Sequence, residues 1–169
     1  MKINYFAFGS NLSSPRLLQR IPLAAKHCVA TLHGHSLRWH KSGHDRSGKC
    51  DIHFTGNQLD LVYGVIYRMS HAEKLELDVY EGAGRGYERR RVSVKAAHGE
   101  VLEAFTYFAT DIDHLLQPYH WYKEHVLRGA LEHDFPAHYV NRNIRAVESK
   151  HDYDVERHYR ELSIYPESA

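Results

Sequence analysis

The sequence of 169 residues is poor in cysteine and proline, with two and five respectively, and it has no long apolar stretch. Two cysteines, Cys28 and Cys50, are too few for a scaffold held together by several disulfides. No apolar run approaches the roughly 18 residues that a membrane-spanning helix needs. Residues 1–4 lack the apolar segment of a secretory signal. We therefore expect a cytoplasmic, reducing setting and no membrane partner.

An excess of charge of either sign is also missing. The 22 Lys and Arg against 21 Asp and Glu give a net charge of +1. Neither nucleic acid nor an anionic membrane is therefore favoured as a partner. The one basic cluster, Arg89-Arg90-Arg91, lies in a predicted strand, where alternate side chains point to opposite faces. We interpret it as solvated strand charge.

The length of the chain fits one domain that buries about two-thirds of its unfolded surface. No repeat or linker divides it, so we expect a single domain over residues 1–148. Residues 149–169 form a charged tail, in which the spacing of Val155, Tyr159 and Leu162 allows a helical turn or two packed on the domain.

The stretch that organises the chain is residues 5–12. The apolar run of residues 3–8 predicts a strand, and Ser14 followed by Pro15 predicts the start of a helix that continues to about Arg20. The loop between them begins with Gly9. Such a passage exposes backbone N–H groups beside a helix N-terminus, which suits a carboxylate or a developing oxyanion. A purely structural turn would carry Gly-Ser-Asn equally well.

Most of the remaining chain shows strand or helix patterns. The expected strands cover residues 29–39 with a break at Gly34, 59–69, 87–97 and 101–109. The expected helices cover residues 70–80, 118–133 and a short stretch after Pro136. Residues 40–57 are polar and contain three glycines, so we expect a long loop on the surface or over a pocket.

The sequence offers candidates for three kinds of reactive site: a metal site, a serine nucleophile and a reactive cysteine. The fifteen histidines suggest a metal site, but no HExxH or paired CxxC spacing occurs. We therefore predict no metal and no cofactor. Ser10 lacks the second glycine of a G-x-S-x-G elbow, so we interpret it as a loop ligand rather than a nucleophile. Neither cysteine lies where a helix N-terminus would activate it, and both are read as inert thiols.

Glu81 differs from the other acidic residues in its setting. It follows a helix that starts with a capping box at Ser70 and Glu73. At the helix end the partial negative charge of the backbone disfavours a carboxylate. Residues 82–86 then contain three glycines, which allow positive φ and close approach to a ligand. A carboxyl group there suits proton transfer, and an exposed helix-end glutamate is the plainer alternative.

These segments, in this order, resemble the γ-glutamylcyclotransferase family. The resemblance covers residues 5–144 and leaves the tail unmatched. The segments that carry it are Tyr5-Phe6-Ala7-Phe8-Gly9-Ser10-Asn11-Leu12, Val62-Tyr63-Gly64-Val65-Ile66-Tyr67, Leu77-Asp78, Glu81-Gly82, Tyr87, Tyr122-Lys123 and Gly129-Ala130.

The resemblance implies an α+β fold, a single small mixed β-barrel flanked by helices. It also implies an enzyme that cyclises a γ-glutamyl group to 5-oxoproline and releases the attached amino acid or amine. Glu81 matches the catalytic general acid/base of the family, and Tyr87 and Tyr122 match aromatic hydroxyls near the site. The substrate-binding loop is matched by Phe8, Gly9, Ser10, Asn11 and Leu12. The family usually has tyrosine where this chain has Phe8, so a hydrogen bond from that hydroxyl is absent here.

The expected partner is therefore a small γ-glutamyl molecule, with a homodimer left open. Two alternatives also remain open. A related cyclotransferase would act on γ-glutamyl amines or on a biosynthetic γ-glutamyl intermediate. A non-catalytic binding module on the same fold would keep the loop of residues 8–12 but would not need an acid at position 81.

Overall fold

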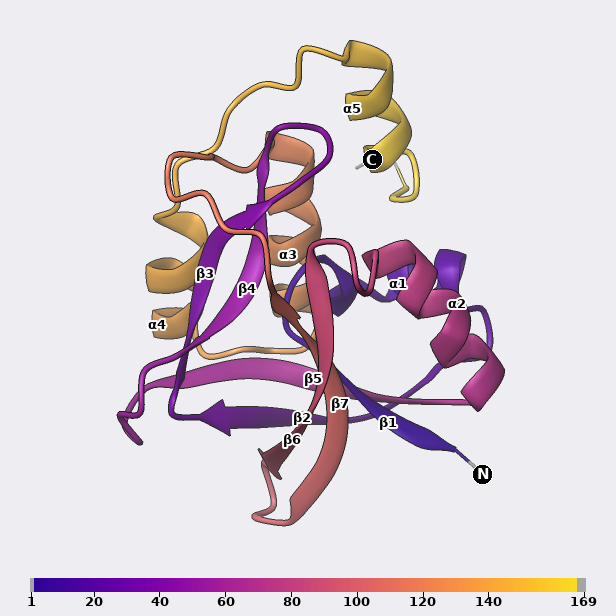
Figure 1. The fold of residues 1–169 in the computed structure, drawn as a ribbon, viewed down its shortest axis with the longest axis vertical. Helices are drawn as coiled ribbons and strands as arrows, with labels where there is room; N and C mark the ends of the chain where they lie inside the picture. Colours follow the sequence, from indigo (N-terminus) through magenta and orange to yellow (C-terminus); the bar gives the residue numbers. More distant parts are fainter. Residues whose placement is uncertain (1, 167–169) are drawn as a thin grey trace.

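The computed structural model describes residues 2–166 and contains a closed five-stranded barrel (Figure 1). The strands follow the order β1, β5, β2, β6, β7. They are β1 (Ile3–Ala7), β2 (Ala25–His33), β5 (Leu61–Met69), β6 (Tyr87–Ala96) and β7 (Val101–Ala109). The strands pair antiparallel except β1 and β7, which run parallel where Tyr5 lies opposite Phe105. The predicted small mixed barrel is confirmed.

The expected continuous loop over residues 40–57 is wrong, because only residues 43–47 and 55–57 lie outside strands. This stretch belongs to a two-stranded sheet outside the barrel, formed by β3 (His35–Ser42) and β4 (Gly48–Phe54). The pairing shifts register between Arg38 and Lys41, which marks a bulge. A bulge interrupts the regular alternation of buried and exposed side chains, and several buried positions are polar. The usual strand pattern is therefore hidden in the sequence.

The helices surround the barrel and the hairpin. Figure 1 shows α1 (Ser14–Arg20) and α2 (His71–Glu81) together on one side of the barrel. The hairpin of β3 and β4 rises beside α3 (His120–Glu132) and α4 (Ala137–Val140). A π-helical turn, Asn141–Arg145, follows α4, and α5 (Val155–Leu162) ends the described chain. The N-cap of α1 is Ser13 rather than Ser14, since its side chain accepts from the Arg16 N–H.

The core depends on close packing across strand β5. Phe6, fully buried, lies over Gly64, where an added Cβ would come within 2.4 Å of the ring. Gly64 therefore lets the aromatic ring cross the strand, which explains the glycine in an otherwise β-branched and aromatic run. Over residues 2–166, no helix is both long and apolar enough to cross a membrane.

Candidate active site

Glu81 is held by two residues that come from the first strand-to-helix passage. Its Oε1 accepts from Asn11 Nδ2 at 2.7 Å and from Arg20 Nη1 at 3.1 Å. The helix ends there because Gly82 adopts the left-handed conformation with φ of 64°, the usual C-terminal stop. Arg20 places a positive charge beside the carboxylate at the negative end of α2. Within residues 2–166, Oε2 of Glu81 makes no hydrogen bond or ion pair, and the Glu81 side chain is 15% exposed.

Asn11 is the centre of this network. Its Nδ2 also lies 3.0 Å from the hydroxyl of Tyr5, and its Oδ1 accepts from Arg20 at 3.1 Å. The residue is 3% exposed, so its amide orientation is fixed by these contacts rather than by water. Asn11 therefore sets the position of Glu81 from β1 and α1 together.

The loop after β1 is a 3-10 turn, Ser10–Leu12, whose shape depends on Gly9. The φ of Gly9 is −112°, outside the left-handed region. Glycine is needed here for space, because an added Cβ would lie 2.9 Å from the Cβ of Cys50 on β4. A second close approach comes from Gly129 of α3, where a Cβ would lie 2.5 Å from the backbone of Leu12. The turn is thus clamped between β4 and α3.

Tyr87 and Tyr122 both form hydrogen bonds to the backbone of Cys50 on β4. Tyr87 donates its hydroxyl to the Cys50 carbonyl at 2.5 Å, and the Tyr122 hydroxyl accepts from the Cys50 N–H at 2.9 Å. Burial raises the pKa of both tyrosines well above the ordinary value. Both hydroxyls therefore stay protonated at neutral pH and act as hydrogen-bonding groups rather than as charges.

These residues enclose a small inner chamber that continues into an outer cleft. The chamber measures about 20 Å³ and the cleft about 300 Å³. Four residues line both spaces and so mark the junction: Ser10, Glu81, Tyr87 and Tyr122. The chamber is completed by Tyr5, Phe8, Gly9, Asn11, Cys50 and Tyr107.

The outer cleft is lined by four cationic side chains: Arg16, Arg20, Lys41 and Lys49. Arg16 Nε donates to Ser10 Oγ at 3.2 Å, and its Nη1 lies 2.6 Å from Glu161 of α5. Lys49 Nζ lies 2.7 Å from Asp45 and against the ring of Trp121 at 4.5 Å. Burial lowers the pKa of Lys49 to about 8, although Asp45 opposes this. The cleft also contains the carboxylates of Asp45 and Glu81, so its lining carries two more cationic than anionic side chains.

The structure brings together seven of the eight site residues predicted from the sequence. Leu12 is the exception: it is 1% exposed, and its carbonyl accepts from His133 Nε2 at 2.8 Å, away from the chamber. The residues of the chamber and cleft that were not predicted include Tyr5, Arg16, Arg20, Lys41, Lys49 and Tyr107. The spacing of Arg16 and Arg20, four apart on a helix that follows the loop, is a signal that could have found two of them.

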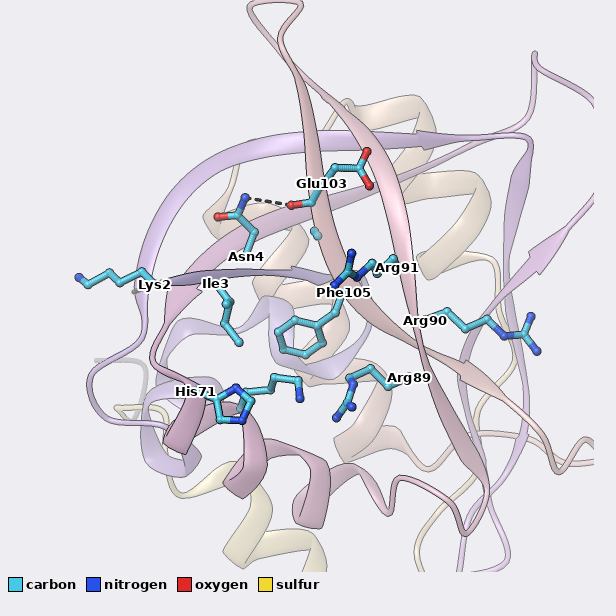
Figure 2. Close-up of a pocket in the computed structure, with 11 residues that line it drawn as sticks. Lys2, Ile3, Asn4, His71, Arg89, Arg90, Arg91, Glu103 and Phe105 are labelled. Carbon is cyan, nitrogen blue, oxygen red and sulfur yellow. Dashed lines mark hydrogen bonds between the residues drawn. The ribbon is translucent and has the colours of Figure 1, made fainter.

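A larger groove of about 610 Å³ lies elsewhere, between α2 and strands β1, β6 and β7 (Figure 2). Its basic side chains Lys74 and Arg89 are paired with Asp78. None of the predicted site residues lines it. Within residues 2–166, no three His, Cys, Asp or Glu side chains converge as a metal site would require. The predicted site residues therefore gather at Glu81 and not in this groove.

Comparisons with known proteins agree with this geometry. Residues 61–142 match the AIG2-like family. The human γ-glutamylcyclotransferase is 31% identical over 152 residues, which cover 85% of this chain and 78% of the relative. The chain belongs to the γ-glutamylcyclotransferase family. The mouse γ-glutamylcyclotransferase is 30% identical over 156 residues, again covering 85% of this chain and 78% of the relative.

A solved γ-glutamyl cyclotransferase structure extends the agreement to the whole fold. It superposes with a TM-score of 0.81 at 28% identity, covering 93% of this chain and 97% of the other. The family assignment therefore includes β1, α1 and the β3–β4 hairpin, which lie before the segment that matches the AIG2-like family. Arg20 comes from α1, Lys41 from β3, and Asn11 from the 3-10 turn between β1 and α1.

Proposed function

We propose that this member of the γ-glutamylcyclotransferase family cyclises a γ-glutamyl group to 5-oxoproline and releases the attached amine. The α-amine of the substrate attacks its own γ-carbonyl carbon. One C–N bond forms and the C–N bond to the leaving group breaks, so the reaction needs no protein nucleophile. The protein must hold the two reacting atoms about 3 Å apart and transfer protons from the attacking nitrogen to the leaving nitrogen.

The setting of Glu81 is the observation that carries the proposal. One oxygen is fixed by Asn11 and Arg20, the other has no hydrogen-bond partner among residues 2–166, and Glu81 lines both the chamber and the cleft. A carboxylate in that position accepts the proton that the substrate's α-ammonium must lose. It then returns the proton to the leaving nitrogen as the tetrahedral intermediate collapses. The attacking nitrogen loses a second proton when it becomes the lactam N–H, and Glu81 passes this proton to the departing amine too, which leaves as an ammonium ion. Protons therefore balance over the cycle, and Glu81 ends as it began.

The inner chamber suits the carbonyl oxygen of the substrate. Its volume of about 20 Å³ is close to the space that one water molecule requires, about 10–15 Å³ of probe-occupied volume. The chamber is lined by Gly9, Ser10 and Asn11 at the start of the 3-10 turn, where the N–H groups have no partner within the turn. Donors of this kind stabilise the oxyanion that develops during attack. The leaving group then occupies the outer cleft, since the chamber has no room for it.

The same proposal includes the cellular setting and the partner. Both cysteines, Cys28 and Cys50, are free thiols, which supports a reducing cytoplasmic compartment. The partner is a small γ-glutamyl compound that enters the outer cleft.

The activity is tested by measuring 5-oxoproline released from three substrates: γ-glutamyl-alanine, glutathione and a γ-glutamyl amine. Glu81→Gln should reduce kcat by about 10²–10⁴-fold, the usual contribution of general acid–base catalysis, while the fold stays intact by circular dichroism. Glu76→Gln removes the same charge from an exposed position of α2 and should leave turnover unchanged. A Glu81→Gln protein within a few-fold of the parent would refute the role of Glu81. A parent that forms no 5-oxoproline from any of the three compounds would refute the activity.

A further inference from the structure

Lys41 has a largely buried side chain whose ammonium group is not fully enclosed, and the proposed mechanism does not use it. It lies on β3 and is 5% exposed, yet it lines the outer cleft. Among residues 2–166 it forms no ion pair within 4.0 Å and no side-chain hydrogen bond. Its nearest described contacts are the ring of Tyr87, 4.7 Å from Nζ, and the backbone at Gly86.

The hairpin places a second lysine directly beside it. Lys41 and Lys49 are opposite each other in the β3–β4 register, so their side chains emerge on the same face. Like charges in this arrangement repel. Asp45 neutralises Lys49, with Oδ2 2.7 Å from Nζ, whereas no carboxylate of the described chain does so for Lys41. Burial lowers the pKa of Lys41, and the acids that oppose this are Glu81, Asp111 and Asp45, none of them in contact.

An uncompensated buried charge destabilises a fold, and an apolar side chain of similar size would be more stable there. An anion that enters the cleft would offset this loss of stability by pairing with the Lys41 ammonium group. Gly86 has a φ of 127°, a conformation that favours glycine, and a Cβ there would lie 3.0 Å from Lys41 Nζ. Gly86 therefore leaves the ammonium room at the wall of the cleft.

We propose that Lys41 is a specificity-determining residue that binds a carboxylate on the leaving group of the γ-glutamyl substrate. The inference rests on the proposed function and adds the chemistry of the departing half. The inner chamber is too small for the leaving group, and Lys41 lines the outer cleft but not the chamber. The leaving group therefore passes Lys41, and an amino acid carries the carboxylate that a simple amine lacks.

A matched pair of substrates isolates this contact. γ-Glutamyl-alanine and γ-glutamyl-ethylamide differ only in the carboxylate of the leaving group. For Lys41→Met, kcat/KM for γ-glutamyl-alanine should fall about 10- to 100-fold, the worth of one hydrogen bond to a charged group, while the value for γ-glutamyl-ethylamide stays within about threefold. Lys95→Met, an exposed lysine on β6, is the control and should leave both values unchanged.

A thermal measurement without substrate gives a second, independent result. Lys41→Met should raise Tm, because it removes a buried charge that has no counter-ion in the free protein. A lowered Tm would mean that Lys41 has a structural partner, and this would overturn the proposal even if activity fell.

The outcomes also separate this proposal from the proposed function. Equal losses on both substrates would place Lys41 at the γ-glutamyl half and overturn the assignment to the leaving group, with the cyclotransferase activity intact. An unchanged kcat/KM of Lys41→Met on both substrates would also overturn the assignment of Lys41 to the leaving group. A parent protein that forms no 5-oxoproline from either compound would refute the activity itself, and the thermal result would still decide whether Lys41 is an uncompensated charge.

Discussion

The ion pair between Glu161 on α5 and Arg16 on α1 ties the last helix to the loop of the active site. Arg16 is 8% exposed and holds Ser10 Oγ through its Nε at 3.2 Å. Glu161→Gln keeps the size of the side chain but leaves this guanidinium without its carboxylate. Removing one partner of a fully buried pair costs about 3–5 kcal/mol. Because the Glu161 side chain is 24% exposed, we expect a smaller loss of stability, about 1–3 kcal/mol.

The pH dependence of this loss follows from the carboxyl group. Burial opposes ionisation of Glu161, but contacts with His125 and Arg16 outweigh it and lower the pKa from 4.5 to about 2. A group with a depressed folded pKa stabilises the fold above its unfolded pKa and loses that contribution as pH falls through the folded pKa. The stability difference between parent and Glu161→Gln should therefore be complete above pH 4.5 and should shrink toward pH 2.

Thermal unfolding by circular dichroism across pH 3–7 measures this difference. For a domain of this size each kcal/mol shifts Tm by about 2–4 °C, so the expected drop at pH 7 is about 2–12 °C. Glu156→Gln, an exposed position on α5, is the control and should show no comparable drop. In turnover assays the KM of Glu161→Gln should rise, because Ser10 lines the substrate space. An unchanged Tm at pH 7, or a difference that does not vary with pH, would contradict the reasoning.

Two further substitutions test how the loop is built. Ser10→Ala should lower turnover by about tenfold or less, since one hydrogen bond is worth about 0.5–1.5 kcal/mol; 5-oxoproline release as low as that of Glu81→Gln would instead favour Ser10 as a nucleophile. Gly129→Ala should lower Tm although alanine favours a helix by about 1 kcal/mol, because its Cβ would lie 2.4 Å from the Cβ of Leu12 and overpacking costs about 1–3 kcal/mol. A Tm of Gly129→Ala above that of the parent in thermal unfolding would show that α3 can move away from the turn.

The parts of the site that could be predicted are those set by local chemistry. The capping box at Ser70 and Glu73 fixes where α2 begins, and Gly82 fixes where it ends. Glu81 is therefore placed by signals within thirteen consecutive positions of the sequence. The strand, turn and helix over residues 3–20 are likewise local, so the two halves that meet at Glu81 and Asn11 were each recognisable.

The pairing of these halves was not recognisable, because it depends on the barrel. Asn11 and Glu81 are 70 positions apart, and their contact of 2.7 Å exists only when β5 pairs with β1 and leads into α2. The helix end and the glycine loop near position 81 therefore give only part of the setting of Glu81. Arg20 supplies a positive charge at that end, which the pattern of residues near position 81 does not contain.

The β3–β4 hairpin shows why the cationic half of the cleft was missed. Its buried positions carry polar groups that have tertiary partners, such as Asp51, which accepts from His40 Nε2 at 2.8 Å and from the Ala109 N–H at 2.7 Å. Polar residues satisfied in this way look like loop residues in the sequence. Lys41 is different because no such partner is found for it in residues 2–166. Within the described chain the carboxylate of Asp51 therefore has partners, whereas the ammonium group of Lys41 has none. This arrangement suits Lys41 to bind a negative charge that arrives with the substrate.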